Sequence, residues 1–185
     1  SKLYHIKYPI DGTNEFITII TTRPETMLAD TAIAVNPKDK RYDNLIGKFV
    51  TIPIVERKIQ IIQDDFADPN QGTGAVKITP AHDFNDYEVG KRNKLEIINV
   101  LTEDGKINNN APSNYIGLDI FEARKKIVSD LESKSLLNKV ENYIVKIPRG
   151  DRTGTVIEPM LTDQWFVAMT KKSDDGKSIS EKALD

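Results

Sequence analysis

A group of hydroxyl side chains and one guanidinium follows an apolar run near the start of the sequence. The segment Thr21-Thr22-Arg23-Pro24-Glu25-Thr26 comes directly after the β-branched stretch 16–20. Threonine hydroxyls and an arginine fork suit the oxygens of a ribose or a phosphodiester, and the proline stiffens the exit from the preceding strand. The alternative is a turn in which the threonines bond to their own backbone. Spacing alone favours the turn.

A second segment, 72–87, joins a glycine-containing strand to a helix with acidic residues in its first turn. Alternation along the strand places Lys77 and Thr79 on one face. Asp83 and Asp86 are three residues apart, so they share a helix face, and a helix N-terminus favours ionised carboxylates. These groups predict a pocket for a small zwitterionic or aminated ligand. The alternative, equally open, is that both aspartates only cap the helix.

Other catalytic chemistries are poorly supported by the residue types present. The His82-Asp83 pair is typical of histidine-aspartate phosphohydrolases, but such a metal site needs several more imidazoles and only His5 remains. The absence of cysteine excludes disulfides, thiolate nucleophiles and zinc-finger spacings. No Gly-x-Ser-x-Gly elbow or Walker-type loop occurs. We therefore expect no metal in the site.

Composition indicates a globular chain of one domain with an appendage. The 185 residues are 38% hydrophobic and 29% charged, which argues against a disordered polyelectrolyte or a fibrous repeat. A net charge of -2 excludes a polybasic nucleic-acid binder held mainly by counterion release, while a local contact stays open. No apolar stretch approaches the ~20 residues that span a bilayer, and no signal peptide begins at Ser1. We expect a cytoplasmic chain with no membrane partner.

The elements that must position these residues follow from short runs of β-branched residues between turn signals. Asp11-Gly12, Asn36-Pro37 and Asp104-Gly105 are among those signals. Expected strands cover residues 16–21, 49–55, 58–63, 75–79, 97–101, 143–147 and 155–158. The pattern predicts a mainly β protein with helices, and seven short strands suggest a barrel.

Two helices are expected to decorate these strands. Asp119 caps the first, Glu122 stands three residues on, and apolar residues then repeat at helical spacing to Leu131. The second, shorter helix runs from about Asp83 to Arg92. Because the apolar pattern fades into polar residues near position 171, we divide the chain into a domain at 1–169 and a polar linker or frayed end at 170–185.

Taken together, these segments resemble the editing domain of valyl-tRNA synthetase, an insertion in a class I enzyme. The motifs that carry the resemblance are residues 21–28, 72–74, 77–92, 101–105 and 154–166. Isoleucyl and leucyl relatives share the Thr-Arg-Pro-Glu-Thr strand and the second aspartate, Asp86. The residue pattern at 79–86 resembles the valyl enzymes instead. The resemblance implies an α+β fold in which helices decorate a closed β-barrel. It also implies a fragment, because the class I signatures His-Ile-Gly-His and Lys-Met-Ser-Lys-Ser are absent and the chain opens without Met.

The activity implied by the resemblance is hydrolysis of the ester of mischarged threonyl-tRNA(Val), without the synthetic reaction. Threonine is an isostere of valine that adds a hydroxyl, and the difficulty of rejecting it is the standard example for this enzyme class. The implied partners are the 3′-terminal adenosine of tRNA(Val) carrying threonine and the remainder of the synthetase. Editing needs no cofactor, whereas the parent synthetase would use ATP and Mg²⁺.

The same resemblance assigns roles in recognising the amino acid. Asp86 would bind the α-amino group, since a carboxylate is the natural partner of an ammonium. Asp83 would accept the threonine γ-hydroxyl, with Thr79 assisting, so that valine would leave a buried acceptor unpaired.

Further roles concern the adenosine and the ester. Arg23 and Lys77 would hold the terminal adenosine and the ester region, where Lys77 could stabilise a developing oxyanion. Thr21 and Thr22 would bind ribose and position water. The resemblance thus gives Thr22, Lys77 and Asp86 as catalytic, and it implies substrate binding by Thr21, Arg23, Glu25, Thr26, Thr79, Asp83 and Asp86.

One departure from the family pattern bears on adenine binding, because Gln71 stands where some members carry an aromatic residue. His82 is expected to be structural, tying backbone at the junction of strand and helix. Two alternatives remain: a non-catalytic module that receives the tRNA 3′ end, and an isoleucyl-type editing domain acting on valyl-tRNA(Ile). A free-standing trans-editing hydrolase is disfavoured by the segment Gln164-Trp165-Phe166, which resembles the return toward a catalytic core.

Overall fold

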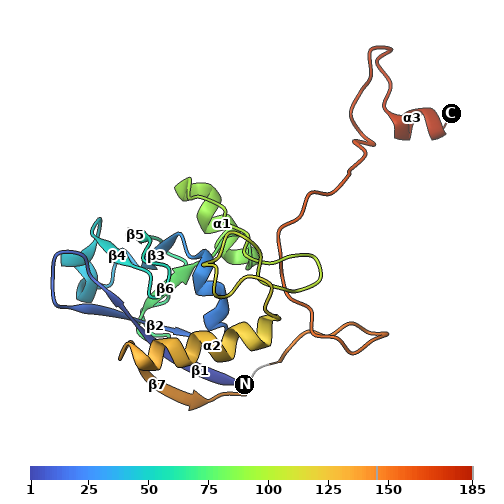
Figure 1. The fold of residues 1–185 in the computed structure, drawn as a ribbon. Helices are drawn as coiled ribbons and strands as arrows, with labels where there is room; N and C mark the ends of the chain where they lie inside the picture. The colour runs from blue at the N-terminus through green and yellow to red at the C-terminus, as the bar shows by residue number, and fades with distance from the viewer. Residues whose placement is uncertain (145, 185) are drawn as a thin grey trace.

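The computed structural model describes residues 1–144 and 146–184 (Figure 1). The strands are β1 (Lys2–Pro9), β2 (Phe16–Thr21), β3 (Ala32–Val35), β4 (Phe49–Thr51), β5 (Lys58–Gln63), β6 (Ala75–Ile78) and β7 (Leu137–Asn142). The α-helices are α1 (Phe84–Asn93), α2 (Ile120–Ser133) and α3 (Ile179–Leu184), and two 3₁₀ helices are η1 (Pro24–Ala29) and η2 (Lys40–Leu45). The fold is therefore a mixture of helices and sheets.

The strands form two sheets that meet at two edges. A three-stranded antiparallel sheet has the order β2-β1-β7, and a four-stranded sheet has the order β4-β5-β3-β6, in which β3 and β5 are parallel. A bridge between Ile10 and Val50 joins β1 to β4, and the Thr73 hydroxyl donates to the Thr18 carbonyl at 2.7 Å beside β2. The ladders recorded for the described residues do not make a continuous ring, so the closed barrel stays a prediction.

The larger of two apolar clusters lies between the sheets and α2. Period-2 alternation buries Ile6 and Tyr8 on β1, and Ile17 and Ile19 on β2. The inward face of α2 consists of Ile120, Ala123, Ile127 and Leu131, all buried in this core. Asp119 accepts from the Phe121 N–H as the cap of that helix, so the expected helix is confirmed.

The strand predictions are partly correct. Strands β2 and β5 have the expected bounds, and β6 ends one residue early. Strand β4 stops at Thr51 because Pro53 lacks an N–H and the following turn places Ile54 and Glu56 at positive φ. The predictions for 97–101 and 155–158 are wrong, since only isolated bridges at Leu101 and Val156 form there.

The remaining differences concern strands whose sequences lack a strong signal. The expected strand 143–147 includes Val145, which lies outside the described residues, and its other residues form no strand. The strand in this region is β7, six residues earlier, a mostly exposed edge strand of polar composition. β1 and β3 were not predicted. β3 is short and buried throughout, so it shows no alternation.

Helix α1 is confirmed at the position expected for it, at the end of β6. Asp83 is its N-cap, and Lys94 ends it in the left-handed region at φ 55°. The helix continues through Gly90, where an added Cβ would lie only 2.7 Å from the Pro80 ring. The missing side chain lets α1 pack closely against the turn that follows β6.

The chain beyond the core is extended. Figure 1 shows the segment after about residue 160 leading away from the two sheets to α3. Trp165 and Phe166 on this segment are almost fully exposed. The division at residue 169 stays a prediction, and Asp185, in the expected linker, lies outside the described residues. No helix in residues 1–144 or 146–184 combines the length and apolar character that crossing a membrane requires.

Candidate functional site

A cavity of about 250 Å³ opens where the ends of β2 and β6 meet the start of α1. Its lining residues are Ile20, Thr21, Thr22, Arg23, Thr26, Phe66, Val76, Lys77, Thr79, His82, Asp83, Asn85 and Asp86. All the residues that the sequence assigns to the site are in this set except Glu25. The two segments singled out by their chemistry therefore form one site.

Lys77 on β6 and Thr79, the residue that follows this strand, lie on the same side, as the alternation predicts, and both bond to a third residue, Asp30. The Lys77 ammonium donates to Asp30 Oδ1 at 2.9 Å and also to the Thr79 hydroxyl, which itself donates to Asp30 Oδ1 at 2.6 Å. Tyr8 donates to the other Asp30 oxygen at 2.7 Å, and burial together with Asp30 raises the Tyr8 pKa well above its usual value. Asp30 is completely buried, so it compensates the charge of Lys77 inside the protein.

Asp30 was missed by sequence reasoning. It lies one residue beyond Ala29, which ends η1, and shortly before the buried apolar strand β3. A charged residue leading into a fully apolar run is a signal that a buried partner is needed, because an unpaired buried carboxylate is very costly. The identity of that partner, Lys77, depends on the pairing of β3 with β6.

The two aspartates of the second segment have different environments. Asp83 Oδ1 accepts from the N–H groups of Asn85 at 2.8 Å and Asp86 at 3.1 Å, so it caps α1 and remains exposed. Asp86 is 7% exposed, and its Oδ2 accepts from the Thr79 N–H at 2.8 Å. Burial raises the pKa of Asp86 to about 6, against the opposing effects of Lys77 and the Thr79 bond. The capping interpretation is therefore correct for Asp83 and wrong for Asp86.

Arg23 is fixed at both ends of its guanidinium. Nη1 donates to the His82 carbonyl at 3.0 Å, and Nη2 donates to Glu158 Oε2 at 2.5 Å. Nε lies 3.5 Å from Glu25, which is completely buried and bonded to Arg124 of α2 at 2.7 and 2.8 Å. Glu25 thus lies behind Arg23 and outside the cavity, and its assignment to substrate binding stays untested.

The hydroxyls of the first segment divide between backbone bonds and the cavity. Thr21 accepts from the Arg23 N–H at 3.1 Å, and Thr26 donates to the Arg23 carbonyl at 3.0 Å. These two bonds belong to the turn that was the alternative interpretation of this segment, in which the threonines bond to nearby backbone. The Thr22 hydroxyl has no hydrogen bond recorded to the described residues, which leaves it available at the cavity wall.

His82 ties together three parts of the chain. Its Nε2 accepts from the Val100 N–H at 3.1 Å, and its Nδ1 lies 3.4 Å from the Pro159 carbonyl. Burial lowers the pKa of His82 to about 4, so the ring is neutral at physiological pH. With Nε2 accepting, the proton belongs on Nδ1, facing the carbonyl. The structural role expected for His82 agrees with these contacts.

Phe66 is the aromatic residue of the cavity, and sequence reasoning missed it. The turn that carries it is fastened to α1, because Asp64 accepts from the Phe66 N–H at 2.9 Å and from Arg92 at 2.5 and 2.8 Å. Gln71 does not line the cavity. The signal was an aromatic residue in an otherwise polar turn, where binding residues often occur.

Across the part of the chain that the structure describes, no three His, Cys, Asp or Glu side chains gather as a group that could hold a metal ion.

Comparison with known proteins places this geometry in a family. A family model described as the leucyl-tRNA synthetase editing domain matches residues 40–145, more than half of the chain. The chain belongs to this editing-domain family.

Curated proteins similar to this chain include valine–tRNA ligases. This chain is 63% identical over 185 residues to the valine–tRNA ligase of Pelagibacter ubique, and the match covers 100% of this chain and 20% of that protein. The valine–tRNA ligase of Dechloromonas aromatica is 57% identical over 183 residues, covering 99% of this chain and 19% of that protein. These matches confirm the resemblance to valyl-tRNA synthetase, and the editing domain spans about a fifth of the length of these curated relatives.

A solved structure shares the fold of the editing domain. It is agnB2 LeuRS of Agrobacterium radiobacter K84, in a ternary complex with tRNA and LeuAMS. The match has a TM-score of 0.61 at 17% identity and covers 100% of this chain and 27% of that chain. At this identity the likeness concerns the fold alone.

Proposed function

We propose that this editing domain hydrolyses the ester of threonyl-tRNA(Val), in the cytoplasm and as part of a larger valyl-tRNA synthetase. The observation that carries the proposal is the cavity that all the predicted hydroxyls, cations and carboxylates line, except the carboxylate of Glu25. It combines a buried carboxylate, a capping carboxylate and a hydroxyl that bonds to none of the described residues, which are groups suited to a zwitterionic ester of ribose.

Asp86 binds the α-ammonium of the threonyl group. It is the least exposed carboxylate on the cavity wall, and burial already disfavours its ionised form in the empty site. A substrate ammonium stabilises the ionised carboxylate, replacing the hydration that Asp86 loses on burial. Its bond to the Thr79 N–H fixes the carboxylate before the substrate arrives.

Asp83 accepts the threonine γ-hydroxyl. Its Oδ1 is committed to the cap of α1, and Oδ2 remains for the ligand. Thr79 assists indirectly, because its hydroxyl already bonds to Lys77 and Asp30. Valine would leave Asp83 without a donor, and a site built to bond a hydroxyl discriminates strongly against the analogue that lacks it.

The reaction needs water and charge stabilisation. A water oxygen attacks the ester carbonyl carbon, the bond from that carbon to the ribose oxygen breaks, and the ribose hydroxyl leaves with a proton, which gives threonine and uncharged tRNA. Thr22 orients the water or the ribose. Lys77 stabilises the oxyanion only in part, since Asp30 compensates its charge. Arg23 is held by Glu158 and the His82 carbonyl, so it keeps a fixed positive charge at the cavity wall.

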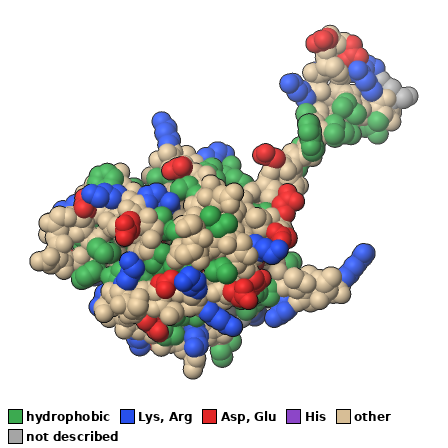
Figure 2. Space-filling view, in the orientation of Figure 1, with side chains coloured by type: hydrophobic (Ala, Val, Ile, Leu, Met, Phe, Trp, Pro, Cys, Tyr) green, Lys and Arg blue, Asp and Glu red, His purple; other side chains and the backbone are tan. Residues whose placement is uncertain are grey.

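Most of the affinity for tRNA comes from the remainder of the synthetase. The net charge is -2, and Figure 2 shows basic and acidic side chains interspersed over the visible face. Such a surface gains little from counterion release. ATP and Mg²⁺ belong to the synthetic site of the parent enzyme and take no part in editing.

The test is deacylation of threonyl-tRNA(Val) beside valyl-tRNA(Val) and valyl-tRNA(Ile), by the full-length synthetase and by the 185-residue chain. We expect hydrolysis of the threonyl ester and much slower hydrolysis of the two valyl esters. Binding of threonyl-tRNA(Val) without turnover would favour the non-catalytic module, and preference for valyl-tRNA(Ile) would favour an isoleucyl-type domain.

A further inference from the structure

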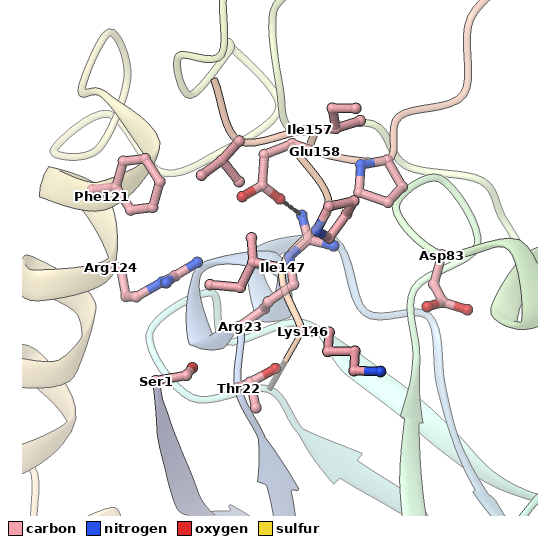
Figure 3. Close-up of a pocket in the computed structure, with 13 residues that line it drawn as sticks. Ser1, Thr22, Arg23, Asp83, Phe121, Arg124, Lys146, Ile147, Ile157 and Glu158 are labelled. Carbon is pink, nitrogen blue, oxygen red and sulfur yellow. Dashed lines mark hydrogen bonds and ion pairs between the residues drawn. The ribbon is translucent and has the colours of Figure 1, made fainter. Parts of the chain in front are cut away.

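A second cavity, of about 230 Å³, adjoins the site and shares Thr22, Arg23 and Asp83 with it (Figure 3). Its other walls come from Ser1, from α2 and from the return segment, which we define as residues 146–169. The three shared residues lie at the junction of the two cavities. A ligand whose end occupies the first cavity therefore has a path into the second.

The walls of the second cavity suit a flat apolar ring. Phe121 contributes a half-exposed aromatic side chain from α2, and the Arg124 guanidinium lies 5.3 Å from its ring centroid. Figure 3 shows Ile147 of the return segment across from Arg124, and Ile157 adds a second aliphatic side chain to the lining. Aromatic and guanidinium surfaces between aliphatic side chains form a stacking platform for a nucleobase.

Among the lysine and arginine side chains that the structure describes in this cavity, the two arginines are paired and one lysine is not. Arg23 is paired with Glu158, and Arg124 is paired with the buried Glu25. Lys146, by contrast, is exposed and has no ion pair recorded with any residue that the structure describes. In Figure 3 its side chain is drawn between Thr22 and Asp83, two of the residues that both cavities share. An exposed ammonium in that position suits a phosphate.

We propose that the second cavity binds the nucleotide that precedes the terminal adenosine of the tRNA. Its base, a cytosine in tRNA, lies against Phe121, and the phosphate that links it to the adenosine lies at Lys146. The inference rests on the proposed function and deepens it, because hydrolysis itself requires only the aminoacyl adenosine. The second nucleotide supplies affinity and sets the depth to which the ester enters the first cavity.

Three substrates separate these contacts: the threonyl esters of adenosine, of 5′-phosphoadenosine and of cytidylyl-adenosine. With the unmodified chain we expect KM to fall when the phosphate is added and to fall about fivefold or more when the cytidine is added, as base stacking predicts. The fall in KM that the phosphate causes should become smaller as the salt concentration is raised.

Variants assign each step to its residue. Lys146→Ala should abolish the gain from the phosphate, and Phe121→Ala should abolish the gain from the cytidine, which Phe121→Tyr should retain. Lys125→Ala removes an exposed cation of α2 that does not line the cavity, and it should keep both gains. Equal KM values for the three esters with the unmodified chain would overturn the proposal.

Failure of the proposed function is distinguishable from failure of this subsite. If no ester is hydrolysed, the proposed function is wrong, and binding of non-hydrolysable amide analogues of threonyl-adenosine and threonyl-cytidylyl-adenosine still decides the subsite. Tighter binding of the dinucleotide analogue, lost in Phe121→Ala, supports it. Equal dissociation constants for the two analogues refute it.

Discussion

The carboxylate of Asp86 accepts a hydrogen bond at 2.8 Å from the backbone N–H of Thr79, the residue that follows β6. This bond closes the turn between strand and helix, and it holds a buried carboxylate at the wall of the cavity. Lys77 and the Thr79 bond favour the ionised form, but burial outweighs them and raises the pKa of Asp86 to about 6. The group assigned to the substrate ammonium is therefore both fixed and poorly solvated.

Replacing Asp86 with asparagine should abolish hydrolysis and stabilise the protein at neutral pH. Because the folded-state pKa lies above the unfolded value of 3.8, ionisation of Asp86 costs free energy that is fully present above about pH 6, shrinks as pH falls from about 6 toward 3.8, and is gone below 3.8. The shift corresponds to about 3 kcal/mol at most. Denaturant unfolding should show Asp86→Asn more stable than wild type at about pH 8, and the difference should vanish near pH 4.

The same titration governs activity. In the unmodified chain, kcat/KM for the threonyl ester should decline as pH falls through about 6, because a protonated Asp86 cannot pair with an ammonium. An Asp86→Asn variant with wild-type turnover would refute the assigned role.

Asp83→Ala should reduce the preference for threonine over valine and should also weaken α1. Loss of the cap costs about 1 kcal/mol, and loss of the hydroxyl acceptor removes the penalty on valine. Deacylation of threonyl-tRNA(Val) and valyl-tRNA(Val) measures the preference.

Two variants separate the cap of α1 from the specificity of Asp83. Asp83→Asn retains a capping oxygen, so it should restore stability without restoring the preference. Asp119→Ala removes the cap of α2 and should leave the preference intact. If threonine and valine hydrolysis fall by the same factor in Asp83→Ala, the specificity role is wrong.

Arg124→Met should destabilise the protein by about 3–5 kcal/mol, because it leaves the Glu25 carboxylate buried without its bidentate partner. The double variant Glu25→Gln with Arg124→Met should recover most of that loss. Urea unfolding is the measurement, and Lys125→Ala, an exposed neighbour, is the control. A stable double variant with a strongly raised KM for threonyl-adenosine, which lacks the nucleotide proposed for the second cavity, would instead support substrate binding by Glu25.

Phe66→Ala should raise KM for threonyl-adenosine about fivefold or more, since stacking of a base on an aromatic ring contributes about 1–3 kcal/mol. Phe66→Tyr should keep the wild-type value. Phe49 is a similarly exposed phenylalanine on β4, away from the cavity, and Phe49→Ala should have no effect on KM. An unchanged KM in Phe66→Ala would place adenine elsewhere.

Chelators should leave both deacylation and melting temperature unchanged, because the cavity offers one neutral, backbone-bonded imidazole and no cysteine. The experiment compares activity and thermal unfolding with and without EDTA. Stoichiometric metal near His82, removable with loss of activity, would contradict the expectation.

Much of the site was predictable from local patterns. Period-2 alternation placed Lys77 and Thr79 together, and a spacing of three put Asp83 and Asp86 at the start of one helix. These patterns succeed because side-chain direction within a strand or helix depends on the backbone over only a few residues. The strands that local patterns missed, β3 and β7, are fully buried or mostly exposed, so neither alternates.

The tertiary structure alone decided which groups pair and which remain free. Asp30 meets Lys77 across 47 residues, Arg124 meets Glu25 across 99, and Glu158 meets Arg23 across 135. A buried charge needs a partner, so the sequence indicates the need, but only packing brings distant segments close enough to satisfy it. The fold thereby turned Glu25 away from the cavity, turned Phe66 into it, and left Thr22 and Lys146 available for a ligand.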